Sequence, residues 1–177
     1  FPRMSDEDMQ SVIAWLRSSD PELAPDAHEY PPNKYNFFIK ALSNTLFGPL
    51  PMQQQPIIKP DTTDKVLFGK YVADGVIGCF ACHSGDVMEF NEMEPEKSGN
   101  YFGGGNVMLD MDGKTPVNVA NITMDKETGI GNWTEQQFAD AVRFGKKPQG
   151  GMLHYPMTPH AALTETEVKA IFAYLKT

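Results

Sequence analysis

Apolar residues recur with helical spacing in two segments, 5–17 and 164–176. Each segment opens with a residue that caps helices well, Ser5 or Thr164, and carries acidic residues in its first turn, where they suit the helix dipole. A spacing of i, i+3, i+4 and i+7 predicts an amphipathic α-helix. The two stripes are formed by Met9, Val12, Ile13 and Leu16, and by Val168, Ile171, Phe172 and Leu175.

Two more helices are expected between these segments. Residues 134–144 follow Thr134, and Gln137 completes a capping box, as Glu167 does for Thr164. Residues 61–73 have an apolar side as well, with Thr62 or Thr63 as the cap and with Gly75 and Gly78 as breakers. A short helix is possible within residues 35–46. The Gly-rich stretch 84–132 is predicted to be mostly loops, which gives an all-α fold.

Three parts follow from this pattern. Residues 1–18 form an isolated helix, residues 19–61 a Pro-rich linker that wraps the domain, and residues 62–177 one domain. Residues 4–17 also align with residues 163–176 in cap, acidic turn, apolar stripe, aromatic residue and final cation. Any two capped amphipathic helices look similar, but the matched ending favours a true duplication.

Charge and composition narrow the function. The net charge of −8 argues against nucleic acid as a partner, because phosphates require a basic surface. It favours steering toward a partner with a basic docking patch. No run of 18 apolar residues is present, so membrane association is expected only through segments outside this sequence or through partner subunits. The start at Phe1 suggests a processed or incomplete N-terminus.

The most specific motif is Cys79-Phe80-Ala81-Cys82-His83, which contains both cysteines of the chain. Its C-x-x-C-H spacing is that of a c-type haem attachment site, in which two thiols reach the porphyrin and the histidine binds the iron. A zinc site would need a second ligand pair. A thioredoxin-like pair would follow a strand rather than a helix, and a structural disulfide is the simplest alternative. We therefore expect one haem c, with iron bound by His83.

The ten methionines and the other histidines are the candidates for the second axial ligand of the iron. Met157 is the favoured candidate, because it lies between Pro156 and Pro159, which stiffen the loop. A methionine ligand suits a six-coordinate electron carrier. Met152 is an alternative, and His154 or His160 would give a bis-histidine haem.

These motifs carry a resemblance. The order helix, C-x-x-C-H, loop, methionine, helix is similar to that of class I cytochromes c. Residues 121–123, 129–138, 143–145 and 153–157 resemble, more specifically, bacterial di-haem and multi-haem cytochrome c subunits of membrane-bound dehydrogenases. The resemblance implies a class I cytochrome c fold with a long N-terminal extension, Met157 as axial ligand, and a periplasmic or otherwise extracytoplasmic location. The first helix then resembles the closing helix of a preceding cytochrome domain, which would carry a further haem.

Two side chains are weaker candidates for the haem site. Trp133 can donate its indole N–H to a haem propionate, or simply pack in the core. Arg143 can neutralise a propionate, or remain a solvated cation.

The function expected from the whole pattern is electron transfer between redox proteins such as a dehydrogenase, an oxidase or another cytochrome. The chain would then be a carrier rather than an enzyme. A peroxidase-like haem enzyme and a haem gas sensor are the alternatives, and both require an open sixth position on the iron.

Overall fold

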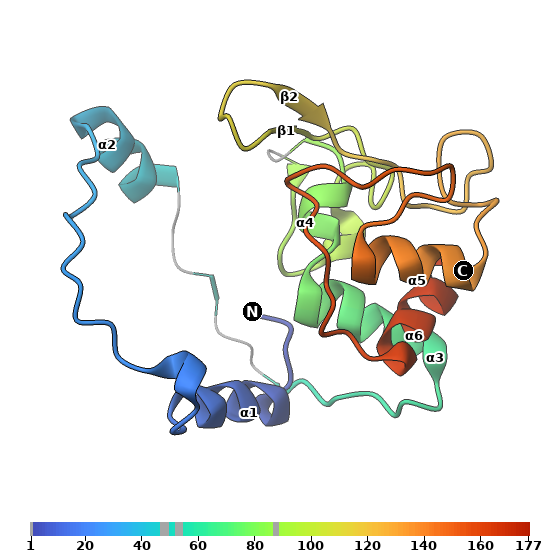
Figure 1. The fold of residues 1–177 in the computed structure, drawn as a ribbon, viewed down its shortest axis with the longest axis horizontal. Coiled ribbons are helices and arrows are strands. Elements are labelled where there is room, and N and C mark those ends of the chain that lie inside the picture. The colour runs from blue at the N-terminus through green and yellow to red at the C-terminus, as the bar shows by residue number, and fades with distance from the viewer. Residues whose placement is uncertain (1, 47–49, 52–54, 87–88) are drawn as a thin grey trace.

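The computed structural model describes residues 2–46, 50–51, 55–86 and 89–177. Parts of the predicted linker, residues 47–49 and 52–54, lie outside the described residues. Figure 1 shows a helical domain built from the C-terminal two thirds of the chain, with an N-terminal helix and a long arm beside it. In chain order the elements are α1 (Asp6–Leu16), η1 (Pro21–Leu23), α2 (Phe37–Leu46), α3 (Lys65–Lys70), the π-helix η2 (Tyr71–Ile77), α4 (Phe80–His83), η4 (Pro95–Lys97), β1 (Val107–Leu109), β2 (Pro116–Asn118), α5 (Glu135–Phe144) and α6 (Glu165–Leu175).

The core of the domain lies where α3, η2, α5 and α6 meet. The stripe predicted for the last helix is buried there, and the rings of Phe138 and Phe172 join α5 to α6 with centroids 5.2 Å apart. Gly69 lets α3 approach α6 closely, because a Cβ at this position would overlap the carbonyl group of Ala170. Burying a large apolar side chain contributes about 1.5–3 kcal/mol, so this four-element junction supplies much of the stability of the domain.

Capping residues in the sequence correctly predicted the ends of α5 and α6. Both capping boxes are present, one between Thr134 and Gln137 and the other between Thr164 and Glu167. Gly145, with φ of +70°, follows α5 as the sequence pattern of a C-cap requires. These ends depend on residues three or four positions apart, which is why the sequence alone predicts them.

The helix expected at residues 61–73 differs from the prediction. Its N-cap is Asp64, whose carboxylate accepts a hydrogen bond from the backbone N–H of Leu67 at 3.0 Å, and neither threonine serves as the cap. The helix also continues past residue 73 as η2 and ends at Gly78, which has φ of +75°. Gly75 does not break it. A Cβ at Gly75 would lie 2.7 Å from the carbonyl oxygen of Arg3, so this glycine makes room for the N-terminal segment.

A small antiparallel sheet corrects part of the all-α prediction. Strands β1 and β2 pair with Met108 opposite Val117, inside the stretch that was expected to be mostly loops. Asp112 organises the turn between them, because its carboxylate accepts hydrogen bonds from the N–H groups of Lys114 and Thr115, both at 2.8 Å. The structure is therefore mostly helical with one two-stranded sheet.

The N-terminal segment is fastened to η2. The Tyr71 hydroxyl accepts a hydrogen bond from the backbone N–H of Ser5 at 3.0 Å and lies 2.6 Å from a carboxylate oxygen of Asp8. Lys59 donates to the other oxygen of Asp8 at 2.9 Å, and Arg3 donates to the carbonyl group of Met93. Helix α1 is thus held at its first turn.

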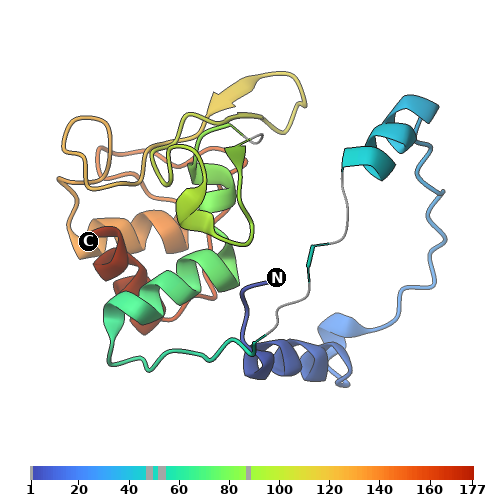
Figure 2. The same ribbon diagram turned by 180° about the vertical axis from the view of Figure 1, so that it is seen from behind.

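Between α1 and α3 the chain forms an arm, and the part of it that carries α2 stands clear of the helical domain in both ribbon views (Figures 1 and 2). Every residue from 24 to 45 is exposed. Ile57, later in the predicted linker, packs against the core of the domain, and the wrapping of residues 19–61 as a whole stays a prediction. The short helix expected within residues 35–46 is present as α2.

Candidate haem site

The three residues of the C-x-x-C-H motif lie on one turn of helix. Gly78 ends η2, and the backbone N–H of Cys79 then bonds to the carbonyl oxygen of Ala73 at 2.8 Å. The N–H of His83 bonds to the carbonyl oxygen of Cys79 at 3.0 Å, which closes the turn. Side chains three and four positions apart share a helix face, so both thiols and the imidazole are presented on the same side of α4.

A backbone carbonyl holds the His83 ring in place. The Nδ1 atom of His83 lies 2.8 Å from the carbonyl oxygen of Ala120, just after β2. A carbonyl only accepts, so Nδ1 carries the proton and Nε2 keeps its lone pair. Burial lowers the pKa of His83, although the contact with Ala120 opposes this. A neutral imidazole fixed through Nδ1 is the usual arrangement of a histidine that binds metal through Nε2.

Both cysteines have free thiols, which a haem can use for thioether bonds. Burial raises the pKa of Cys79 to about 12, with the negative charge of Asp74 acting in the same direction, and burial also raises the pKa of Cys82. A redox-active C-x-x-C pair needs a lowered thiol pKa. These environments therefore disfavour the thioredoxin-like alternative, and the donor set fits covalent haem attachment.

Met157 lies in the loop that joins α5 to α6. Two backbone hydrogen bonds fasten this loop to the end of α5, from Leu153 to Gly145 at 2.7 Å and from His160 to Val142 at 2.8 Å. In Figure 1 the loop runs across α4 in the view shown. Met157 itself is half-buried.

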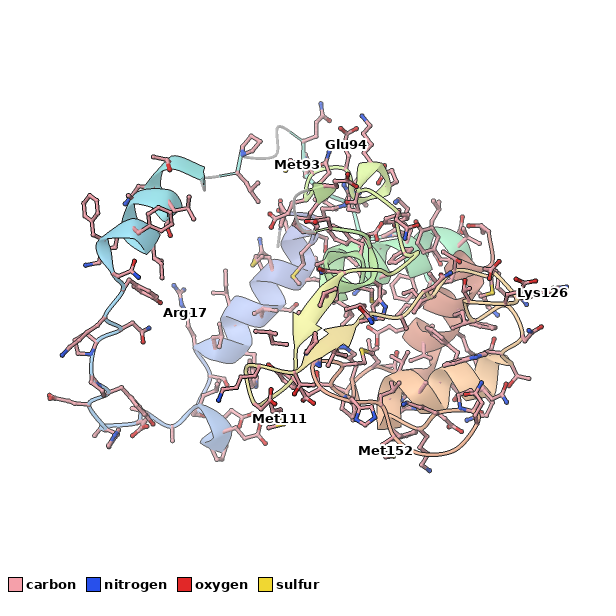
Figure 3. All side chains as sticks on the ribbon, turned by 90° about the horizontal axis from the view of Figure 1, so that it is seen from above. Arg17, Met93, Glu94, Met111, Lys126 and Met152 are labelled. Carbon is pink, nitrogen blue, oxygen red and sulfur yellow. The ribbon has the colours of Figure 1, made fainter. Side chains whose placement is uncertain are left out.

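The rival sixth ligands differ in exposure. His160 is half-buried like Met157, whereas Met152 and His154 are exposed. Figure 3 shows Met152 at the edge of the molecule. A buried methionine sulfur is easier to hold in one position than an exposed one, so these positions agree with the preference for Met157, which stays a prediction.

Trp133 and Arg143 occupy different surroundings. Trp133 is partly buried against the core, and its backbone N–H bonds to the carbonyl oxygen of Ile130 at 2.9 Å. Arg143 lines a pocket between α5 and α6 together with Glu135, Glu165 and Lys169. Its Nε atom is buried with no hydrogen-bond partner in the described part of the chain, and its guanidinium group lies 5.1 Å from the Phe144 ring. A propionate contact for either residue stays a prediction.

Curated proteins provide an independent comparison, although no protein-family model matches the chain. The fructose dehydrogenase cytochrome subunit of Gluconobacter japonicus is 34% identical over 112 residues, which cover 62% of this chain and 20% of that protein. The gluconate 2-dehydrogenase cytochrome c subunit of Pantoea cypripedii is 36% identical over 112 residues, covering 60% and 21%. A cytochrome c subunit of alcohol dehydrogenase (quinone) from Komagataeibacter europaeus is 25% identical over 99% of this chain and 38% of its own length.

The chain is similar to cytochrome c subunits of dehydrogenases. This similarity agrees with the resemblance stated from the sequence motifs. The chain spans about a fifth of the length of the first two relatives.

Sequence reasoning missed a polar cluster just before the motif. The Tyr101 hydroxyl lies 2.7 Å from a carboxylate oxygen of buried Asp74 and 2.8 Å from the Tyr174 hydroxyl. Lys70 donates to Asp74 at 2.8 Å. Burial, together with Tyr174 and Asp74, raises the pKa of Tyr101. The i,i+4 spacing of Lys70 and Asp74 was the one local signal, since the tyrosines come from distant segments.

The missed cluster has a structural consequence for the motif. It joins η2, the loop at Tyr101 and α6 immediately before Cys79. A buried carboxylate needs such partners to offset the loss of hydration. The cluster therefore fixes the middle of η2, the helix that leads into the C-x-x-C-H turn.

Proposed function

We propose that the chain carries electrons through one c-type haem attached at Cys79 and Cys82. His83 and Met157 would be the axial ligands. The observation that carries this proposal is the single helical turn that presents both thiols and an imidazole whose Nδ1 is bonded to Ala120. Bound haem supplies one-electron redox chemistry, and the protein attaches, orients and shields it.

Support for electron transfer also comes from the relatives, which are named as cytochrome subunits of fructose, gluconate and alcohol dehydrogenases. Such a subunit passes electrons and leaves substrate oxidation to its partner. We therefore propose that this chain works with a dehydrogenase in an extracytoplasmic electron-transfer chain. A basic patch on the redox partner would complement the acidic surface of this chain.

Helix α1 supports the proposal of a further haem domain. Ile171 in α6 is 3% exposed, whereas Val12, its counterpart in the repeat, is 41% exposed. No described residue of α1 is buried, although its apolar stripe matches that of α6. We propose that this stripe packs against a helix equivalent to α3 in a preceding cytochrome domain.

Absorption spectra of a Met157→Ala variant test the axial ligand. The purified parent should show a low-spin spectrum in both oxidation states, and its intact mass should include one covalent haem. Met157→Ala should keep the haem mass and lose the low-spin spectrum, because the sixth ligand is removed. The control, Met152→Ala, should behave like the parent. A low-spin spectrum that persists in Met157→Ala contradicts the ligand assignment.

Carbon monoxide separates the electron carrier from the two alternatives. The reduced parent should bind carbon monoxide slowly or not at all, because a gas has to displace methionine. Met157→Ala should bind it rapidly. Rapid binding by the parent would favour a gas sensor or a haem enzyme instead.

A further inference from the structure

The middle of the arm, residues 30–60, has a charge opposite to that of the rest of the protein. Residues 30–60 contain three lysines and no aspartate or glutamate. The whole chain, by contrast, has 23 acidic and 15 basic residues. The cationic side chains are Lys34, Lys40 and Lys59, and only Lys59 is paired with an acidic residue, Asp8, in the part of the chain that the structure describes.

Helix α2, in the middle of this arm, is amphipathic. At 3.6 residues per turn, its apolar side chains cover one broad face, which also includes Thr45, and its other polar side chains share the opposite face. The apolar face carries Phe37, Phe38, Ala41 and Leu42, with Ile39 at its edge. The polar face carries Lys40, Ser43 and Asn44.

The apolar face of α2 is open. Phe37 is 86% and Phe38 72% exposed, although phenylalanine is among the side chains most often buried in proteins. Tyr30 and Tyr35 just before the helix are exposed too. Figure 3 shows the side chains of this helix, coloured cyan, projecting from the ribbon well apart from the helices of the domain.

An anionic lipid surface fits this combination of features. Amphipathic helices that lie in the membrane interface pair aromatic and aliphatic side chains on one face with basic side chains on the other. Helix α2 has this pattern, with Lys40 on its polar face and no acidic residue. A second copy of the chain fits less well, because ten helical residues cover much less than the area of a stable dimer interface. The domain itself is acidic, so anionic lipids would repel it. Because α2 stands clear of the domain, α2 can reach the lipid surface while the domain stays at a distance.

We propose that α2 and the flanking tyrosines bind the surface of an anionic lipid bilayer, with Phe37 and Phe38 inserted into the interface. No helix in the described part of the chain is long and apolar enough to cross a membrane. The arm lies on the bilayer rather than spanning it, so this chain makes membrane contact of its own. That differs from the expectation that contact would come only through other segments or subunits. The proposal does not depend on the haem.

Flotation of the intact chain with lipid vesicles tests whether α2 binds anionic lipid. The parent should float with vesicles of phosphatidylglycerol and phosphatidylcholine, and much less with pure phosphatidylcholine. Phe37→Ser with Phe38→Ser should lower the bound fraction by about tenfold, because the inserted aromatic area is lost. Both side chains are exposed, so the fold should be unaffected, and the absorption spectrum checks this.

A matched control uses other exposed apolar residues. Val12→Ser with Ile13→Ser, on α1, should leave vesicle binding within about twofold of the parent, because this stripe lies outside the cationic segment 30–60. Lys34→Gln with Lys40→Gln should reduce the preference for anionic vesicles. Absence of parent binding, or equal binding by the Phe37/Phe38 variant, overturns the proposal. The proposal is also overturned if the arm does not bind vesicles but is required for binding a purified dehydrogenase subunit, because the partner of the arm would then be a protein.

Discussion

Gly69 is the residue at which the packing of the domain is least tolerant. A methyl group there would meet the backbone carbonyl of Ala170 and the Cβ of Tyr174, and a backbone group cannot move aside as a flexible side chain can. We expect Gly69→Ala to lower the free energy of unfolding by about 1–3 kcal/mol, as overpacked cores do. Chemical denaturation followed by circular dichroism measures the change.

Gly113→Ala provides the comparison for that prediction. Gly113 has φ of +67° in the β1–β2 turn and has open space where a Cβ would be. Its substitution brings backbone strain of about 1 kcal/mol without a steric overlap. If Gly69→Ala is no more destabilising than Gly113→Ala, the close approach of α3 and α6 is not the constraint inferred here.

Some residues of the candidate haem site could be predicted from the sequence, and others could not. Cys79, Cys82 and His83 could be proposed from the sequence because haem attachment would require their spacing within one turn, and their role stays a prediction. Ala120 was not, because it contributes a backbone oxygen 37 positions away, and any residue type supplies that atom. Asp74 and Tyr101 are similar, since their meeting depends on how η2 and a distant loop pack.

At the scale of elements, the junction between α1 and η2 should respond to pH. Burial would raise the pKa of Asp8, but hydrogen bonds from Tyr71 and Lys59 outweigh it and hold this pKa below its ordinary value of 3.8. The attachment is therefore fully stabilised above pH 3.8 and loses this stabilisation as the pH falls through the lowered pKa. The pKa of Lys59 is raised in turn, mainly by the hydrogen bond to Asp8, so its contribution is lost only above pH 10.5.

Hydrogen exchange can follow this junction. Protection of the α1 amides, corrected for intrinsic exchange rates, should drop in acid in the parent. Asp8→Asn should show weaker protection at neutral pH and no such drop, because it lacks the titrating carboxylate. Glu7 also faces Lys59 electrostatically, so Glu7→Gln serves as the matched control and should keep the acid response. An unchanged acid response in Asp8→Asn would assign it to another group.

The sequence predicts the ends of α5 and α6 well, but it does not predict that α3 continues into η2. The boundaries of α5 and α6 follow from capping boxes that each involve four consecutive residues. The extension of α3 into η2 instead depends on Gly75 accommodating Arg3 and on Tyr71 binding Ser5, which are about seventy positions apart. The β1–β2 sheet was missed because three-residue strands give too short an alternation to detect.

For the molecule as a whole, charge is divided between an acidic body and the cationic segment 30–60 of the arm. Under the two proposals, this division would let one chain bind two surfaces of opposite sign. Segment 30–60 would bind anionic lipid, and the acidic body would bind a basic redox partner. Attraction at the body should speed encounter with such a partner at low salt, where the Debye length is about 30 Å, and be largely screened at 0.15 M, where it is about 8 Å.

Electron-transfer rates measured against ionic strength test this division. The haem-loaded chain should reduce a small basic redox protein fastest at low salt, with a second-order rate constant that falls by at least about tenfold toward physiological ionic strength. An acidic redox protein of similar potential should show the opposite slope, because like charges are screened. Lys34→Gln with Lys40→Gln should leave the salt dependence with the basic partner at least as steep as in the parent, because the variant carries more net negative charge. If the rate constants with both partners are independent of ionic strength, the net charge of −8 plays no part in docking.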